Sequence, residues 1–299
     1  MFEYFRRLFP DKKEIVFQDD PTLPVSNMTA GFGIKPELSE TVYRVASCQS
    51  TGMIRAHNED SLFVLNSLLD GVGQGIAFGI FLVADGMGGH QSGEVASHLA
   101  ALGASQSLMN HVYEQYLFDR KVYKKEDVFQ LLNEAVEDVQ NLIKRRVPGG
   151  GTTLTLVLAL GEEIYSAHVG DSRLYVIDGD GQIHQKTKDH SLVKRLVDLG
   201  EITELEALVH PQRNVLYRAL GQMDELEADL DHFTLKQGQT MMICSDGLWG
   251  VLEHDQMQRI LTGRGELNAK AKTLVKAAND AGGPDNITVV LVERITSSD

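Results

Sequence analysis

The chain has 299 residues, of which 42% are apolar, 23% charged and 7% aromatic, so it can bury a hydrophobic core and is expected to be globular. Its 42 acidic and 28 basic residues give a formal net charge of -14, which argues against nucleic acid as the main partner. Cys48 and Cys244 lie far apart and outside any Cys-x-x-Cys spacing. This excludes a disulfide scaffold and a thiolate metal site, and it fits a reducing cytoplasm.

Residues 1–40 are interpreted as an N-terminal extension and linker, and the folded domain is expected over residues 41–295. Phe2, Phe5 and Phe9 recur at helical spacing in a positively charged segment. The sequence alone favours a tail that packs on its own domain or is disordered, and the alternative is a short helix that docks on a partner or a membrane surface. The longest apolar run, 76–84, is too short to cross a bilayer, so a soluble chain is expected.

Short runs of apolar, β-prone residues predict strands along the remaining chain. These runs are 61–65, 76–84, 153–160, 164–169, 174–177, 241–244 and 287–292. Residues 161–163 and 178–181 join neighbouring runs so tightly that hairpins, and hence antiparallel pairing, are expected.

Between the strands, apolar residues recur at helical spacing. The predicted helices contain Val95, Leu99 and Leu102; 128–143, with Leu131, Leu132, Ala135, Val139 and Leu142 on one face; 192–199, closed by Gly200; and 268–279, with Ala271, Leu274, Val275 and Ala278 on one side. Hairpins interleaved with such helices indicate an α+β domain in which helices cover the outer faces of antiparallel sheets.

Five aspartates stand at the ends of predicted strands. Asp60 and Asp285 come just before a strand, whereas Asp85, Asp171 and Asp246 come just after one. In an antiparallel sheet the start of one strand lies beside the end of its neighbour, so these residues can converge on one edge. Any one of them, taken alone, is better explained as a turn or cap residue, and only the five together favour a shared site.

A converged cluster of carboxylates needs protons or cations. Two unit charges about 4 Å apart repel by about 4 kcal/mol at an effective dielectric constant of about 20, while a whole domain is stable by only about 5–15 kcal/mol. Mg²⁺ and Mn²⁺ prefer oxygen ligands and therefore suit a cluster rich in aspartate. Glycine follows both Asp85 and Asp246, which lets the backbone approach a ligand closely, and Arg55 could offer a bidentate fork to a phosphate.

These residues together resemble the metal-dependent Ser/Thr protein phosphatases of the type 2C family in their bacterial form. The motifs occur in the family's order and extend over residues 43–292. They are Gly52-Met53-Ile54-Arg55, Asn58-Glu59-Asp60, Asp85-Gly86-Met87-Gly88-Gly89-His90, Gly151-Thr152-Thr153, Gly170-Asp171-Ser172-Arg173, Asp189-His190-Ser191, His210-Pro211, Arg218-Ala219-Leu220-Gly221, Ser245-Asp246-Gly247 and Pro284-Asp285-Asn286.

The resemblance implies a four-layer αββα sandwich, in which two antiparallel sheets are flanked by helices and metals lie at one end. It implies that Asp85, Asp246 and Asp285 hold one cation and that Asp85 and the Gly86 carbonyl bind a second. Asp60 is expected to belong to the same acidic group.

Three further assignments follow from the resemblance. Asp171 is similar to the aspartate that joins Asp246 at a third ion in bacterial members, and Arg55 occupies the phosphate-binding position. Residues 187–220 resemble the variable flap beside the cleft, with an ordinary helix–loop–helix as the alternative.

The sequence departs from the family at the proton donor. Many eukaryotic members place a histidine near the arginine motif or near the first Asp-Gly, whereas Met87 follows the Asp-Gly here. His57, His90 and a metal-bound water all remain candidates for the general acid.

The resulting hypothesis is a protein phosphatase, active in signal transduction, that hydrolyses phosphoserine and phosphothreonine in proteins. A water bridging two Mn²⁺ or Mg²⁺ ions attacks the phosphorus, and Arg55, Asp60, Asp85 and Asp246 are the catalytic residues. The expected partners are phosphorylated proteins and a Ser/Thr kinase. The alternative is a catalytically silent phosphoprotein-binding or regulatory module of the same fold, which predicts missing metal ligands, although all five aspartates are present.

Overall fold

The computed structural model of the chain describes residues 41–69, 76–88, 91–112, 124–224 and 226–296. All of them belong to one unit of the chain, residues 37–299. The extension expected at residues 1–40 lies outside the described residues.

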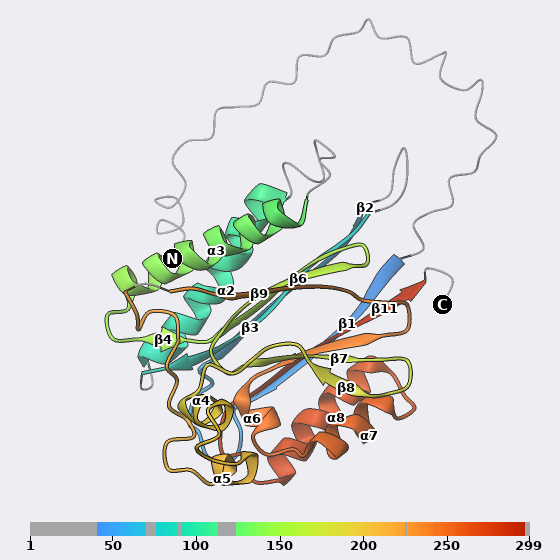
Figure 1. Cartoon of the computed structure of the whole chain (residues 1–299). Helices are drawn as coiled ribbons and strands as arrows, with labels where there is room; N and C mark the ends of the chain where they lie inside the picture. The colour runs from blue at the N-terminus through green and yellow to red at the C-terminus, as the bar shows by residue number, and fades with distance from the viewer. Residues whose placement is uncertain (1–40, 70–75, 89–90, 113–123, 225, 297–299) are drawn as a thin grey trace, which may run out of the picture. The chain divides into compact units, whose positions relative to one another are not determined.

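The described residues form two antiparallel sheets (Figure 1). The first has the order β1-β11-β10-β7-β8 and contains β1 (Thr41–Ser50), β11 (Ile287–Thr296), β10 (Thr240–Cys244), β7 (Arg173–Ile177) and β8 (Ile183–Gln185). The second has the order β2-β3-β5-β6-β9 and contains β2 (Asp60–Leu69), β3 (Ile76–Met87), β5 (Leu154–Leu160), β6 (Glu163–Val169) and β9 (Asp229–Thr234), with β4 (Gly151–Thr152) paired to β3. Every strand expected from the sequence is present.

The two sheets pack face to face through alternating side chains. In β3, Phe81 and Val83 join the core between the sheets, whereas Ile80 and Leu82 join the core beneath the helices. All four are fully buried. Because this central strand is covered on both faces, its sequence is an uninterrupted apolar run instead of an alternating one.

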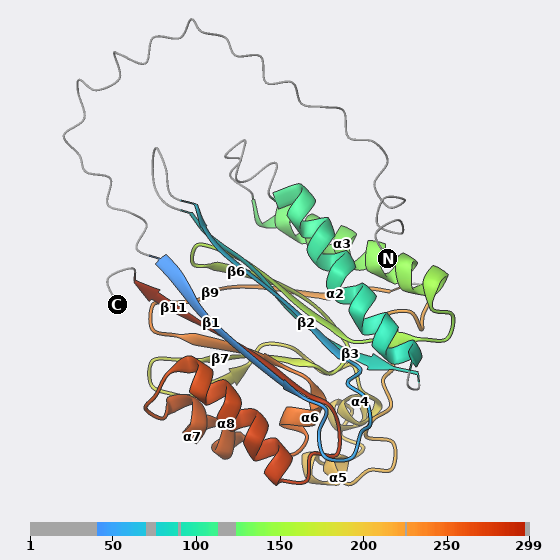
Figure 2. The same ribbon diagram turned by 180° about the vertical axis from the view of Figure 1, so that it is seen from behind.

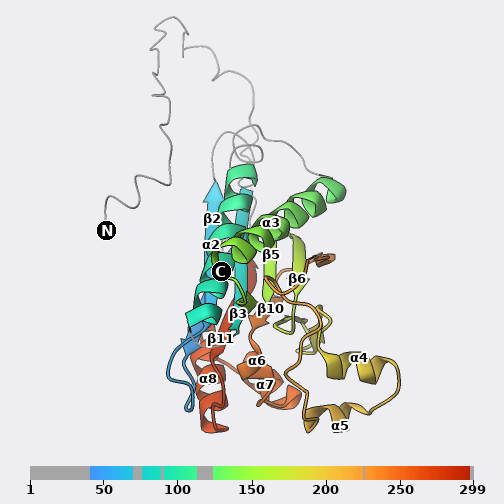
Figure 3. The same cartoon turned by 90° about the vertical axis from the view of Figure 1, so that its left-hand side faces the viewer.

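Helices cover both outer faces of the sheets. Figures 1 and 2 show α2 (Gln91–Val112) and α3 (Lys125–Arg146) on the sheet that contains β3, and α7 (His254–Thr262) and α8 (Leu267–Asp280) on the other. The short α6 (Asp246–Trp249) packs with α7 and α8, and Figure 3 shows α4 (Leu192–Asp198) and α5 (Glu204–Leu208) to one side of them. This arrangement confirms the predicted α+β class and the four-layer αββα sandwich. None of the described helices combines the length and apolar character that crossing a bilayer requires.

The buried face of α2 differs from the expected one. Val95 and Leu102 are 45% and 50% exposed, while Ala96, Ala100 and Ala104 are completely buried. The helix therefore turns its small residues inward, which lets its backbone approach the sheet closely. The prediction named the larger apolar residues, of which only Leu99 packs against the core, and it did not identify the alanines that form the most buried face.

Gly52 shows how closely the chain packs at the end of the first sheet. It has a φ of +79°, and a Cβ at this position would lie 2.2 Å from the Asp285 carbonyl oxygen and 2.7 Å from that of Gly283. Gly200 has a similar φ of +72° but has no atom within 4 Å of such a Cβ.

We expect Gly52→Ala to lower the free energy of unfolding by about 2–4 kcal/mol, because strained backbone and steric overlap add together. Gly200→Ala, the matched control, should cost about 1 kcal/mol, since only the backbone conformation is strained. Urea denaturation of the two variants measures the difference. Equal losses would contradict the close approach of residues 52 and 285.

Candidate metal centre

The structure brings the five aspartates together from both sheets. Asp60 begins β2 and lies directly opposite Asp85 of β3. In the other sheet, Asp246 follows β10 and Asp285 precedes β11, which pairs with β10. Asp171 lies on the connection between β6 and β7, which passes from one sheet to the other. Strand order alone predicts that the aspartates converge on one edge of a single sheet. In the structure they lie where the strand ends of the two stacked sheets meet.

A cleft of about 230 Å³ opens over this cluster. Four of the aspartates line it together with Gly86 and Arg55: Asp85, Asp171, Asp246 and Asp285. Asp60 is 7% exposed and accepts hydrogen bonds at Oδ2 from the Ser245 hydroxyl at 2.8 Å and the Thr288 hydroxyl at 2.6 Å. Two hydroxyl donors thus hold the buried carboxylate beneath the cleft.

Burial and mutual repulsion disfavour the charged forms of these carboxyls. Burial raises the pKa of Asp60 to about 7, although the hydrogen bonds from Thr288 and Ser245 favour the carboxylate. Burial, together with the charge of Asp285, raises the pKa of Asp246 to about 6. Burial and the charges of Asp60 and Asp246 raise the pKa of Asp85 well above its ordinary value. Without compensating positive charge, the cluster therefore retains protons near neutral pH.

Two buried oxygens in the cluster fit a cation. Among the described residues, Asp60 Oδ1 and Asp246 Oδ1 are buried side-chain oxygens without a hydrogen-bond partner. A buried acceptor without a partner is costly, and a hard divalent cation would satisfy it. The Asp85 and Asp246 carboxyls also lie close enough together to shift each other's pKa, so a cation between them would relieve their repulsion. The donor chemistry therefore suits Mg²⁺ or Mn²⁺.

The same carboxyls are currently engaged by protein partners. Asp285 Oδ2 forms a 2.7 Å ion pair with Arg55 Nη2, and Asp60 Oδ2 accepts hydrogen bonds from Ser245 and Thr288. In keeping with this, no group of three or more His, Cys, Asp or Glu side chains in the described residues is already arranged around a common metal position. Cation binding thus requires these side chains to exchange protein partners for the ion.

Gly86 lies where no larger residue fits. A Cβ here would lie 2.3 Å from the Gly93 carbonyl oxygen and 2.6 Å from that of Glu59. The Gly86 N–H donates to the Glu59 carbonyl at 3.2 Å. The backbone of β3 is therefore held against its neighbours at the point where it lines the cleft.

Asn286 fastens the loop that carries Arg55. Its Nδ2 donates to the carbonyls of Thr51 and His57, at 3.0 and 2.8 Å, and its Oδ1 accepts the N–H of Glu59 at 2.8 Å. The Arg55 side chain itself remains 49% exposed. The loop is thus fixed, while the half-exposed guanidinium, paired with Asp285, remains accessible to a ligand.

The sequence argument missed the roles of Ser245, Thr288 and Asn286. Ser245 and Asn286 were quoted only as neighbours of aspartates, and Thr288 was included only in a strand. The sequence does contain one signal for Thr288, which is a hydroxyl residue inside the apolar run 287–292. A buried polar side chain needs a hydrogen-bond partner, so its position indicates a polar neighbour such as an aspartate.

Among the residues that the structure describes, no histidine lines the cleft. His57 is exposed and is not among the residues that line it, and His90 lies outside the described residues. In the segment 187–220, Asn214 and Leu216 do line the cleft, which places part of that segment beside the aspartates.

Comparisons with known proteins agree on one family. The family model described as Protein phosphatase 2C matches residues 56–280. A Listeria innocua protein named Serine/threonine phosphatase stp is 35% identical over 249 residues, covering 81% of this chain and 92% of that protein. The S. agalactiae serine/threonine phosphatase structure has a TM-score of 0.70 at 30% identity and covers 84% of this chain and 99% of that chain. The structure of the catalytic domain of the serine threonine protein phosphatase PstP, in complex with two manganese ions, has a TM-score of 0.68 at 33% identity. The match covers 85% of this chain and 99% of that chain.

The raised pKa of Asp246 predicts a pH dependence of stability. In chelator, the folded protein keeps a proton at Asp246 that the unfolded chain releases at lower pH, so its free energy of unfolding falls as pH rises from about 4 to about 6. The Asp246→Asn variant has no carboxyl to deprotonate at this position, so this fall in the free energy of unfolding is absent. We expect the stability of the variant relative to wild type to increase by about 2 kcal/mol between pH 4.5 and 7.5, as measured by urea denaturation.

Asp280→Asn, on the exposed surface of α8, is the control, because solvent screens that carboxylate and the difference from wild type should stay flat. A difference for Asp246→Asn that is equally flat would contradict the repulsion inferred here.

Proposed function

The chain belongs to the protein phosphatase 2C family, and on that basis we propose that it is a metal-dependent hydrolase that removes phosphate from phosphoserine and phosphothreonine in proteins. The observation that carries this proposal is that four aspartates line one cleft together with Arg55, while the fifth, Asp60, lies buried directly beneath them. Protein phosphatase activity is also what the names of its relatives describe.

We assign the cation ligands to the residues around the unsatisfied oxygens. Asp85, Asp246 and Asp285 would hold one ion, Asp85 and the Gly86 carbonyl a second, and Asp171 with Asp246 a third. Asp60 supports the cluster from beneath through Oδ1. Mn²⁺ and Mg²⁺ are the proposed ions because every donor is a hard oxygen. When bound, such ions lower the pKa of a water and withdraw charge from phosphoryl oxygens.

Arg55 is proposed to bind the phosphoryl group. Its exposed guanidinium can exchange the Asp285 carboxylate for two phosphoryl oxygens, which match its paired N–H groups. The transition state carries its charge on those oxygens, so positioning and electrostatic stabilisation supply most of the catalysis. Asp60 contributes by keeping Oδ2 fixed on Ser245 and Thr288, which leaves Oδ1 directed to a cation or a water.

The proposed setting follows from the reaction. A phosphatase for serine and threonine needs a kinase that phosphorylates the same proteins, so a partner kinase and a role in signalling belong to the proposal. Cys48 and Cys244 are both free, which supports a reducing, cytoplasmic setting. Residues 1–40 are proposed as a docking element for a partner or a membrane surface.

A catalytically silent module of the same fold is not favoured. A module that has lost catalytic activity is expected to have lost metal ligands as well. All five aspartates are present in this chain, and the described structure gathers them at one cleft.

The direct test is hydrolysis of an aryl phosphate and of a phosphothreonine peptide with Mn²⁺, with Mg²⁺ and with chelator. We expect turnover with either ion and none in chelator. Asp246→Asn and Asp85→Asn should each lower turnover by about 10²-fold or more, since each removes charge stabilisation from the reacting group.

Asp280→Asn is the control, because this exposed carboxylate pairs with Lys276 on α8. Circular dichroism shows whether the variants keep their fold. Full activity of the chelated enzyme, or of Asp246→Asn, would overturn the proposed function.

A further inference from the structure

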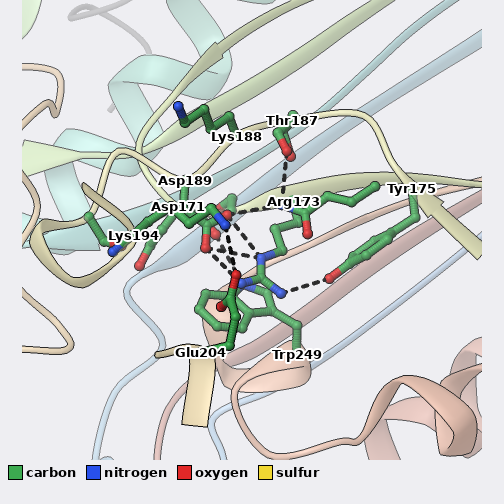
Figure 4. Close-up of polar contacts among 12 residues, drawn as sticks. Asp171, Arg173, Tyr175, Thr187, Lys188, Asp189, Lys194, Glu204 and Trp249 are labelled. Carbon is green, nitrogen blue, oxygen red and sulfur yellow. Dashed lines mark hydrogen bonds and ion pairs between the residues drawn. The ribbon is translucent and has the colours of Figure 1, made fainter. Parts of the chain in front are cut away.

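Arg173 lies beside the metal centre with its guanidinium bonded on several sides (Figure 4). Nε and Nη2 donate to the Asp189 carboxylate at 2.9 and 2.7 Å, and Nη1 donates to the Tyr175 hydroxyl at 3.1 Å. The flat face of the guanidinium stacks on the Trp249 indole, with Cζ 3.5 Å from the ring centroid. The Gly170-Asp171-Ser172-Arg173 motif alone predicts no role for this arginine.

Each partner belongs to an element that builds the centre. Arg173 begins β7 two residues after Asp171, and Trp249 ends the short helix α6, whose first residue is Asp246. Asp189 precedes α4 in the segment that carries Asn214 and Leu216 to the cleft. One guanidinium therefore connects the three parts of the chain that surround Asp171.

Trp249 extends this connection to Asp171 itself. Its Nε1–H donates to the Asp171 carbonyl at 3.0 Å. On the other side of the same turn, the His190 N–H donates to the Gly170 carbonyl at 2.7 Å. The backbone that presents the Asp171 carboxylate is thus held from α6 and from the segment before α4.

The ion pair is buried enough to act as a rigid connection. The Arg173 side chain is 22% exposed and that of Asp189 5%, compared with 49% for Arg55. A bidentate pair with so little water keeps its geometry, and the planar guanidinium can stack and donate at once. Lysine carries the same charge but can do neither in this way.

We propose that Arg173 is a positioning residue that, through Trp249 and Asp189, fixes Asp171 relative to Asp246 and thereby sets the affinity of this carboxylate pair for a divalent cation. This inference rests on the proposed function only in taking these two carboxylates as cation ligands. Residues that orient metal ligands from behind typically change metal affinity by about 10- to 100-fold when they are substituted.

The test uses the protein's own fluorescence. Trp249 is the single tryptophan of the 299-residue chain, so its emission reports on this contact. The full-length wild type, Asp171→Asn and Arg173→Lys are each titrated with Mn²⁺, and calorimetry is run in parallel. The binding event that Asp171→Asn removes identifies the cation at Asp171. We expect Arg173→Lys to keep this event but to need about tenfold more Mn²⁺ for its midpoint.

Two further variants separate positioning from general stability. Arg44→Lys is the matched control, because Arg44 pairs with Glu293 at 3.1 Å but is 42% exposed on β1, and its midpoint should equal that of wild type. Trp249→Phe keeps an aromatic face for Arg173 but loses the N–H donated to Asp171. By calorimetry, it should shift the midpoint in the same direction as Arg173→Lys.

The outcomes are distinct. A wild-type midpoint in Arg173→Lys, even with a lower melting temperature, would show a purely structural ion pair and overturn the proposal. The proposal also fails if wild type shows no Mn²⁺ event that Asp171→Asn removes. If wild type binds Mn²⁺ but hydrolyses neither phosphate ester, the proposed function fails while the titration still decides the role of Arg173.

Discussion

Repulsion among buried carboxylates is the constraint on which the site depends. Burial and neighbouring negative charge raise the pKa of Asp60, Asp85 and Asp246 together, so the cluster is costly to fold in its charged form. The two packed sheets can bear this cost because their central strands, such as β3 and β5, are buried on both faces. Hydroxyl donors and Arg55 reduce the cost, and a divalent cation would reduce it further.

The elements that could be predicted from the sequence are those whose buried residues follow a regular apolar pattern. Strands 76–84 and 287–292 are apolar on both faces, and the predicted face of α8 is fully within the core. β9 and β1 were missed because their residues do not follow such a pattern: β9 has no fully buried residue, and β1 mixes polar residues into both faces. The helix α2 lies so close to the sheet that its buried face carries alanines instead of larger apolar residues. A count of hydrophobic side chains cannot predict this.

The candidate ligands were accessible to sequence reasoning because each aspartate stands at the end of a strand. Their supports were not, because hydrogen bonds join residues that are remote in the chain. Ser245 lies 185 residues from Asp60, and Thr288 lies 228 residues from it. Only the pairing of β10 with β11, and the stacking of the two sheets, brings these hydroxyls to the same carboxylate.

The two arginines near the cleft differ in the environment of their charge. Arg55 is half exposed and pairs with one cleft carboxylate, so a phosphoryl group can replace that partner at little cost. Arg173 pairs with Asp189 away from solvent, and removing either partner would leave a buried charge unpaired. Because the charges of Arg173 and Asp189 cancel, this pair adds little field to the centre. What it contributes is geometry, since the guanidinium orients Trp249, which in turn holds the Asp171 backbone. An arginine whose carboxylate partner can be replaced thus suits binding of the phosphoryl group. An arginine that stays paired away from solvent suits the positioning of the cation ligands.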